Sequence, residues 1–107
     1  MFIENKYIQS TTCGEGIKRK ILASGGKMMT VEVEFQKGAI GANHVHPHEQ
    51  VSYVVKGSFD YHIGKEKCIL RKGDSVYVPS NIEHGCVALE SNSVLLDVFT
   101  PQREDFV

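Results

Sequence analysis

The sequence predicts an all-β fold, either a barrel or a sandwich of short strands. Apolar or alternating runs recur along the chain and are separated by Gly, Asn, Asp, Ser or Pro. Residues 27–35 are the clearest case, because every second residue from Met29 to Phe35 is apolar, which is the period of a half-buried strand. No segment shows a helical period of useful length, and regularly spaced short strands are typical of all-β domains.

At least seven strands are expected, and turn residues mark where the chain reverses. The runs occupy residues 17–22, 27–35, 50–56, 58–63, 66–71, 75–78, 85–89 and 94–100. Residues 56–58 (Lys-Gly-Ser) and 71–74 (Arg-Lys-Gly-Asp) are interpreted as tight turns, because glycine and aspartate favour them.

The length of 107 residues predicts a single domain, residues 1–107, with one core. A chain this short buries only about two-thirds of its unfolded surface. Closing the sheet on itself, or covering one face with a second copy, adds burial and protects strand edges. We therefore expect a homodimer.

Composition argues against several partners and predicts a cytoplasmic location. The formal net charge is −1, and the densest basic run is Lys18-Arg19-Lys20, so nucleic acid and anionic membranes are poor partners. Residues 1–10 hold no continuous apolar stretch, which argues against a signal peptide or a membrane span. Three cysteines without C-x-x-C spacing argue against a disulfide framework and for a reducing compartment.

A His-x-His pair, His44 and His46, is the first candidate metal site. On a strand, residues two apart face one side with Cα atoms about 6.6 Å apart, and two imidazoles at that separation can converge on one ion. His48 and Gln50 share this parity, so alternation alone does not choose among the four. A straight strand from 44 to 50 would span roughly 20 Å. The chain must therefore bend around Pro47 if Gln50 is to reach the same ion.

The remaining candidate ligands have simpler structural interpretations. His48 is interpreted as a solvated residue at the bend. His62, on strand 58–63, is interpreted as a surface or structural residue. Cys86 shares the parity of His84, and a small core residue accounts for it more simply than a thiolate ligand does. A lone His-x-His pair is itself only a weak indication of a metal.

Two longer patterns strengthen the histidine pair: Gly38-x5-His44-x-His46-x3-Gln50-x6-Gly57 and Gly73-x5-Pro79-x4-His84. They resemble the first and second motifs of the cupin superfamily. The resemblance implies a single-domain, double-stranded antiparallel β-barrel of jelly-roll type with a metal inside one end. It also implies the ligands of one divalent transition metal ion (Ni, Mn, Fe, Zn or Co): His44, His46, Gln50 and His84.

The sequence departs from the cupin pattern at three positions. Gln50 stands where most cupins have Glu, Asn81 replaces a Gly, and Ala88 replaces an Asn that is not a ligand. With Gln50 all four implied ligands are neutral. The site then holds its ion with less charge compensation and leaves it a stronger Lewis acid.

The end of the sequence places polar residues beside an apolar strand. Asp97 lies in an otherwise apolar run, where a lone carboxylate is costly unless it is paired, hydrated or protonated. An outward position at the barrel rim is its simpler interpretation. Phe99 shares the parity of Asp97 and faces the same way. A surface ion pair with Glu104 or Asp105 is the simpler interpretation of Arg103.

Four stretches together resemble a group of small cupins that act in pectin degradation: residues 18–22, 46–51, 84–86 and 97–106. Members of this group act on 4,5-unsaturated monouronates released from pectin and alginate, and open the ring to the linear keto form. The resemblance implies a uronate as small-molecule substrate. It also implies that Asp97, Phe99 and Arg103 face that substrate.

These residue types suit a ring opening, which involves no redox change. The hemiacetal must break, and the resulting C5 enol must gain a proton at C4. Asp97 is the candidate proton carrier, provided that burial raises its pKa toward the working pH. Arg103 is expected to grip the uronate carboxylate, and Phe99 to pack on a sugar face.

Two other classes of function stay open. A cupin dioxygenase would use the same ligands for Fe or Cu, although the charged tail favours a carboxylate-bearing substrate over an aromatic one. A non-catalytic sugar- or metal-binding module would use the same cavity without turnover. Oxygen consumption identifies the first class, and saturable uronate binding without turnover identifies the second.

Overall fold

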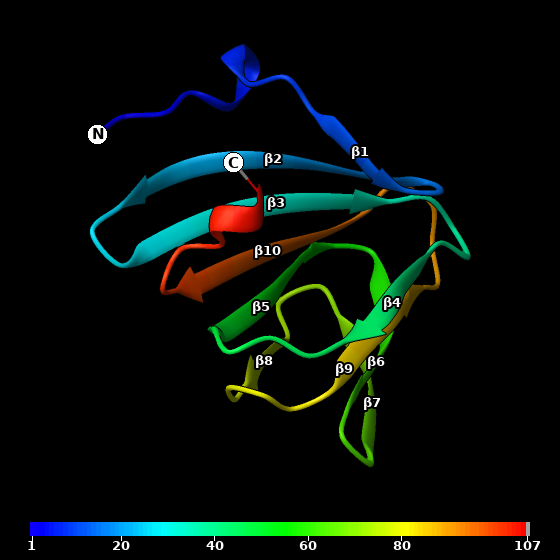
Figure 1. Ribbon diagram of the computed structural model, residues 1–107. Helices are drawn as coiled ribbons and strands as arrows, with labels where there is room; N and C mark the ends of the chain where they lie inside the picture. The colour runs from blue at the N-terminus through cyan, green and yellow to red at the C-terminus, as the bar shows by residue number, and fades with distance from the viewer. Residues whose placement is uncertain (107) are drawn as a thin grey trace.

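The computed structural model describes residues 1–106, which form strands and two short 3-10 helices (Figure 1). The elements in chain order are η1 Asn5–Tyr7, β1 Thr11–Gly14, β2 Ile17–Gly25, β3 Met28–Phe35, β4 Ile40–His44, β5 Glu49–Lys56, β6 Ser58–Ile63, β7 Glu66–Arg71, β8 Ser75–Val78, β9 His84–Ala88, β10 Ser93–Thr100 and η2 Glu104–Phe106. No helix in this part of the chain has the length and apolar character needed to cross a membrane.

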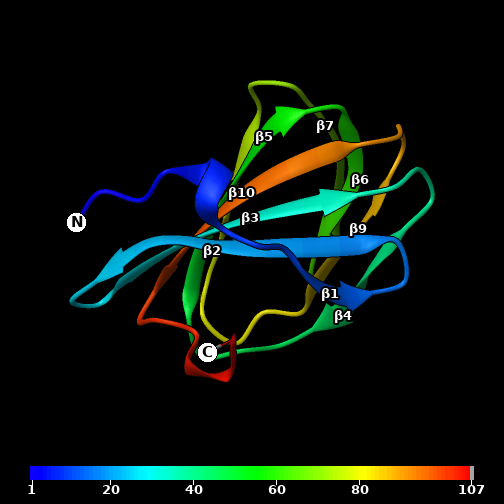
Figure 2. The same cartoon turned by 90° about the horizontal axis from the view of Figure 1, so that it is seen from above.

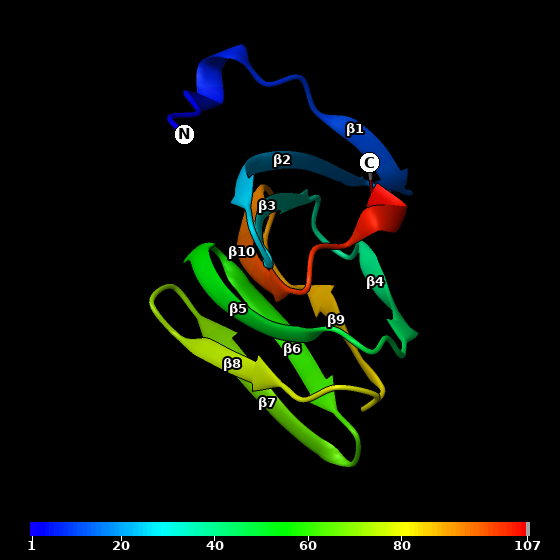
Figure 3. The same cartoon turned by 60° about the vertical axis from the view of Figure 1, so that its left-hand side comes forward.

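Two antiparallel sheets face each other and enclose the interior (Figure 3). The larger sheet has the strand order β1-β2-β3-β10-β5-β8, and the smaller has the order β4-β9-β6-β7. Each pairing between neighbours is antiparallel. This arrangement confirms the predicted all-β, double-sheet barrel.

Each run expected from the sequence overlaps a strand, and the structure adds β1 and β4. The four residues of β1 are all exposed, and β4 buries none of its residues fully. A strand without a buried face lacks the alternation of apolar residues that predicts strands. For this reason neither element left a signal in the sequence.

Apolar side chains from both sheets fill the core. Phe35 of β3 and Phe59 of β6 meet edge to face, with ring centroids 5.1 Å apart, at the centre of the larger cluster. A smaller cluster contains Met29 and Val31 of β3 and Phe99 of β10. The period-two burial predicted for residues 27–35 is observed, because Met29, Val31 and Phe35 are buried.

The inward positions of β10 lead from this core toward polar groups. Leu95 belongs to the larger apolar cluster, Asp97 is the next inward residue, and Phe99 belongs to the smaller cluster. After Thr100 the chain turns back, so that η2 lies near β2 (Figures 1 and 2). The end of the chain thereby covers one end of the barrel.

The turn between β5 and β6 depends on Gly57. Its φ of +78° is a conformation that side-chain-bearing residues rarely adopt. A Cβ added at this position would also collide with Ser93, both its side chain and its Cα. The predicted turn at residues 71–74 is likewise present, with Gly73 at a φ of +93°.

Candidate metal centre

Three histidines from neighbouring strands and the loop after them meet at one end of the barrel. His44 ends β4, His84 begins β9, and the two are direct partners in the strand pairing. His46 lies two residues beyond the end of β4. One ring nitrogen from each of the three lies within 4.8 Å of the others. The structure thus brings these three sequence-predicted residues together.

A bend brings Gln50 to the same place. The chain bends at Pro47 and His48 and returns as β5, in which Gln50 is the second residue. Gln50 Oε1 lies 3.0 Å from His46 Nε2. A bend at this point was expected from the sequence, because a straight strand would hold Gln50 too far from His44. His48 is half-buried at the bend, outside the group of three histidines.

Backbone carbonyl groups fix the tautomer of all three rings. A carbonyl oxygen only accepts hydrogen bonds, so each Nδ1 that faces one carries the hydrogen in the neutral ring. Each Nε2 then has the free lone pair, and such hydrogen bonds orient metal-binding histidines. The Nδ1 contacts are His44 to Ala42 O at 2.8 Å, His46 to His48 O at 3.0 Å and His84 to Ile82 O at 2.9 Å.

The surroundings of two Nε2 atoms indicate a cation site. His84 Nε2 is buried and has no hydrogen-bond partner within residues 1–106. His46 Nε2 faces Gln50 Oε1, and with the hydrogen on Nδ1 both atoms are acceptors. Burial lowers the pKa of His46, and lowers that of His84 to about 4, so neither ring gains a second proton at neutral pH. Buried acceptors that converge in this way fit a divalent ion.

A chain of hydrogen bonds connects Gln50 to Asp97. Gln50 Nε2 donates to Ser52 Oγ at 2.9 Å, and Ser52 Oγ donates to Asp97 Oδ1 at 2.6 Å. Because Ser52 has one hydroxyl hydrogen, it accepts from Gln50 while it donates to Asp97. This direction turns Gln50 Oε1 toward the histidines.

Asp97 is an interior carboxyl group. It is only 8% exposed. Burial raises its pKa to about 6, although the hydrogen bond from Ser52 and the charge of Arg103 oppose the rise. The interpretation of Asp97 as an outward residue at the rim is therefore wrong.

Arg103 forms an ion pair and also lines the cavity. Its Nε and Nη2 atoms donate to Asp105 at 2.9 Å and 2.7 Å, which is the ion pair of the simpler interpretation. This contact lowers the pKa of Asp105 to about 2. The guanidinium carbon also lies 5.3 Å from the ring centroid of Phe99 and 4.3 Å from that of Phe106. With only 12% of its side chain exposed, Arg103 covers the interior rather than extending into solvent.

One cavity of about 380 Å³ is lined by most of these groups. This volume lies within the range of about 300–1,000 Å³ that is usual for small-molecule sites. Its lining combines apolar residues of both sheets with the polar set His44, Gln50, His84, Asp97 and Arg103, and with Phe99.

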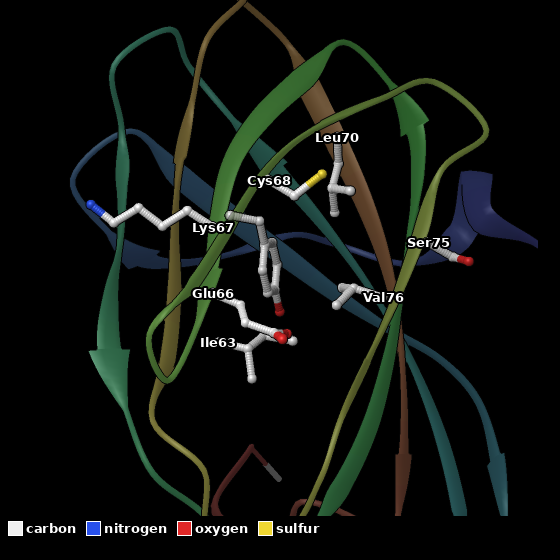
Figure 4. A pocket seen from close by; sticks show the side chains of 8 residues that line it. Ile63, Glu66, Lys67, Cys68, Leu70, Ser75 and Val76 are labelled. Carbon is white, nitrogen blue, oxygen red and sulfur yellow. The ribbon is translucent and has the colours of Figure 1, made fainter.

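A second hollow, of about 490 Å³, lies beside β7 and β8 (Figure 4). Tyr61 lines both spaces. Figure 4 shows apolar and polar side chains together around the second hollow, with the Lys67 chain extending away from the others. Within the described residues, two members of the group able to hold a metal, His44 and His84, line the smaller cavity, which makes that cavity the candidate site.

His62 and Cys86 lie outside the histidine group. His62 is half-buried on β6. Cys86 belongs to the larger apolar cluster, and burial raises the pKa of its thiol to about 12. Both observations agree with the structural roles expected for these residues.

The two-sheet barrel with its histidine group defines the class of this protein. Residues 31–99 match the Cupin domain family, and the chain belongs to this family. Over 95 residues it is 50% identical to the pectin degradation protein KdgF of Dickeya dadantii (strain 3937), an alignment that covers 88% of this chain and 86% of that protein.

Solved structures show the same relationship. KdgF from Halomonas sp. superposes with a TM-score of 0.97 at 39% identity, covering 100% of this chain and 98% of that one. An RmlC-like cupin from Shewanella frigidimarina has a TM-score of 0.94 at 40% identity, covering 99% and 95%. A predicted oxalate decarboxylase from Thermotoga maritima, at 15% identity and a TM-score of 0.84 over 95% and 100%, shares the fold.

Three residues of the cavity region were not predicted as site residues from the sequence: Ser52, Arg19 and Phe106. Ser52 did leave a signal, since it is a polar residue with the inward parity of Gln50 on β5. Arg19 and Phe106 meet only because the end of the chain folds back onto β2. No local pattern in the sequence encodes that contact.

Proposed function

We propose that this protein opens the ring of 4,5-unsaturated monouronates from pectin or alginate and converts them to the linear keto form. The observation that carries the proposal is that Asp97 and Arg103 line the same cavity as His44, Gln50 and His84. Such an isomerisation needs a proton carrier and a cation for the substrate carboxylate in one place. The identity to a pectin degradation protein supports this substrate class.

In this proposal His44, His46, Gln50 and His84 hold one divalent transition metal ion, which is Ni, Mn, Fe, Zn or Co. Three imidazole nitrogens and an amide oxygen are donors that these ions accept. When bound, the ion supplies Lewis-acid stabilisation of the negative charge that develops on the C5 oxygen. The carbonyl contacts of Nδ1 keep the three rings oriented before the ion arrives.

We assign the proton transfer to Asp97. The ionised carboxylate removes the proton of the C1 hydroxyl as the bond between C1 and the ring oxygen breaks. The carboxylic acid then gives that proton to C4, which turns the C5 enolate into a ketone, so no atom or electron is gained or lost. Ser52 binds Oδ1, which leaves Oδ2 for the exchange. The pKa of about 6 suits a group that acts as base and then as acid near neutral pH.

Arg103 binds the substrate carboxylate in this scheme. Asp105 occupies the edge of the guanidinium formed by Nε and Nη2. Nη1 and the second hydrogen of Nη2 form another edge, which can hold a carboxylate with two parallel hydrogen bonds. Phe99 is buried beside the histidines, 5.9 Å from His46 between ring centroids. It packs on the sugar and helps to exclude water.

A proton NMR time course tests this function. Metal-loaded protein is mixed in D2O with a 4,5-unsaturated monouronate prepared with a lyase. We expect the C4 vinyl signal to disappear faster than in the protein-free sample, with deuterium incorporated at C4. A rate equal to the spontaneous rate overturns the assignment as an enzyme, and oxygen consumption during the reaction supports a dioxygenase instead.

We further propose that the protein acts as a homodimer in the cytoplasm. The outer face of the larger sheet exposes apolar side chains on neighbouring strands, which a second copy would cover. These residues are Val51, Tyr53 and Val55 of β5 and Tyr77 of β8. Cys13 and Cys68 are exposed free thiols, which supports a reducing compartment.

A further inference from the structure

Strand β2 carries three consecutive cations with different surroundings. Lys18 lies opposite Glu34 and Lys20 lies opposite Glu32 in the pairing of β2 with β3. These two lysines share the outer face of the sheet with acidic partners, as cross-strand charge pairs commonly do. Arg19 has the opposite parity, lies opposite the apolar Val33, and lines the cavity.

Arg19 is a half-buried cation on the inner face of the sheet, which is an unusual place for one. Ile17, Val33 and Phe35, which also line the cavity, supply the apolar inner faces of β2 and β3 around it. Its guanidinium carbon lies 3.9 Å from the ring centroid of Phe106. Within residues 1–106 it forms no ion pair and donates no side-chain hydrogen bond. Arg19 therefore has a positive charge and five N–H donors without a protein acceptor in this part of the chain.

The two arginines of the cavity, Arg19 and Arg103, differ in their partners. Both guanidinium groups stack on Phe106, at 3.9 Å for Arg19 and 4.3 Å for Arg103, so the two cations lie at the same end of the cavity. Asp105 neutralises Arg103 with two hydrogen bonds. Arg19 has no such partner within the described residues. Among residues 1–106, an anion that enters the cavity thus meets one guanidinium with a single edge open and another whose donors have no acceptor.

We propose that Arg19 is a second carboxylate-binding residue of this cavity, which acts beside Arg103 and selects acidic sugars over neutral ones. The inference rests on the proposed uronate chemistry. A carboxylate satisfies the donors of Arg19 and balances its charge, whereas a neutral sugar leaves that charge without a counter-ion in an apolar wall. A contact made equally in the bound substrate and the transition state affects KM more than kcat.

The kinetic test uses Arg19→Met, which removes the charge and keeps a long apolar side chain against Phe106. Lys18→Met is the matched control, since it removes one positive charge from the adjacent, outward position of the same strand. With a 4,5-unsaturated monouronate, Arg19→Met should raise KM about 10-fold or more and change kcat less than about 3-fold. Lys18→Met should leave both constants unchanged. Arg19→Lys should recover part of the lost affinity, because it restores the charge without the planar fork.

Equal KM values for Arg19→Met and Lys18→Met would overturn the proposal. A binding experiment separates that failure from failure of the proposed reaction. Calorimetric titration of the metal-loaded protein with D-galacturonate, and with D-galactose as neutral analogue, requires no turnover. We expect galacturonate to bind more tightly than galactose, and Arg19→Met to reduce the difference without removing it, because Arg103 is still present; an unchanged difference in Arg19→Met rejects the proposal. A reduced difference supports the role of Arg19 even if ring opening is not accelerated. Equal binding of the two sugars to the wild-type protein, or binding of neither, rejects it.

Discussion

Replacing Asp97 by asparagine should stabilise the metal-free protein at neutral pH and not at pH 4. Asparagine keeps the shape of the side chain and an oxygen that accepts from Ser52, but it carries no charge. Burial raises the pKa of Asp97 from the ordinary 3.8 to about 6 in the folded chain. The folded state therefore binds the proton more tightly than the unfolded state does. The wild-type protein loses stability as pH rises from about 4 to about 6, and the loss persists above that window.

The magnitude follows from the shift of about two pKa units. At about 1.4 kcal/mol per unit, the ionised carboxylate costs the folded state about 3 kcal/mol at pH 7.5. For a domain of this size that corresponds to a change in Tm on the order of 10 °C. The variant lacks this titration, so the Tm of Asp97→Asn minus that of wild type should be close to zero at pH 4 and on the order of +10 °C at pH 7.5.

Thermal unfolding followed by circular dichroism at several pH values, after removal of metal with a chelator, measures this difference. Taking variant minus wild type cancels the titration of the histidines, which both proteins share. Asp60→Asn is the matched control, because Asp60 is exposed on β6 and its replacement should give a difference close to zero throughout. A Tm difference for Asp97→Asn that is constant between pH 4 and pH 7.5 would refute the reasoning, because it would show that the carboxylate is not penalised by burial.

Three further experiments examine the metal, the chemistry and the assembly. His84→Ala should lose most of the bound transition metal in elemental analysis, whereas His62→Ala should keep about one ion per chain; full occupancy in His84→Ala would remove it from the ligand set. Asp97→Asn should lower kcat about 100-fold or more with a modest change in KM, and Arg103→Ala should mainly raise KM; wild-type turnover by Asp97→Asn would exclude it as the proton carrier. Light scattering should give the mass of a dimer for wild type and of a monomer for Tyr53→Glu, and a monomeric wild type at high micromolar concentration would contradict the proposed assembly.

Most of the fold could be predicted from the sequence, because buried and more exposed residues alternate along the strands of this protein. On β3 and β10 inward and outward residues alternate, so the period of two predicted both the strands and the faces that they bury. Strand β1 was missed because all of its residues are exposed. Its place at the edge of the larger sheet comes from pairing with β2, which is a long-range property without a local pattern.

The candidate site was predictable as a set of residues and less so as a set of contacts. The spacing of the histidines and Gln50 predicted that they lie close together, because the bend at Pro47 limits where these side chains can meet. The orientation of Gln50 depends on Ser52, which is itself bound to Asp97, 45 positions further along the chain. The environment of Arg19 depends on the fold-back of the last residues. Such contacts between distant segments are not encoded in local spacing.

The hydroxyl group of Ser52 links the identity of residue 50 to that of residue 97. Its single hydrogen goes to Asp97, and its lone pair receives the amide of Gln50. A glutamate at position 50 has no hydrogen to give, so Ser52 would face two carboxylates with one proton to share. A chain that places an acid at position 97 thus gains from an amide, rather than the more common acid, at position 50. We expect the two positions to vary together among related sequences, with Glu at the first wherever the second is not acidic.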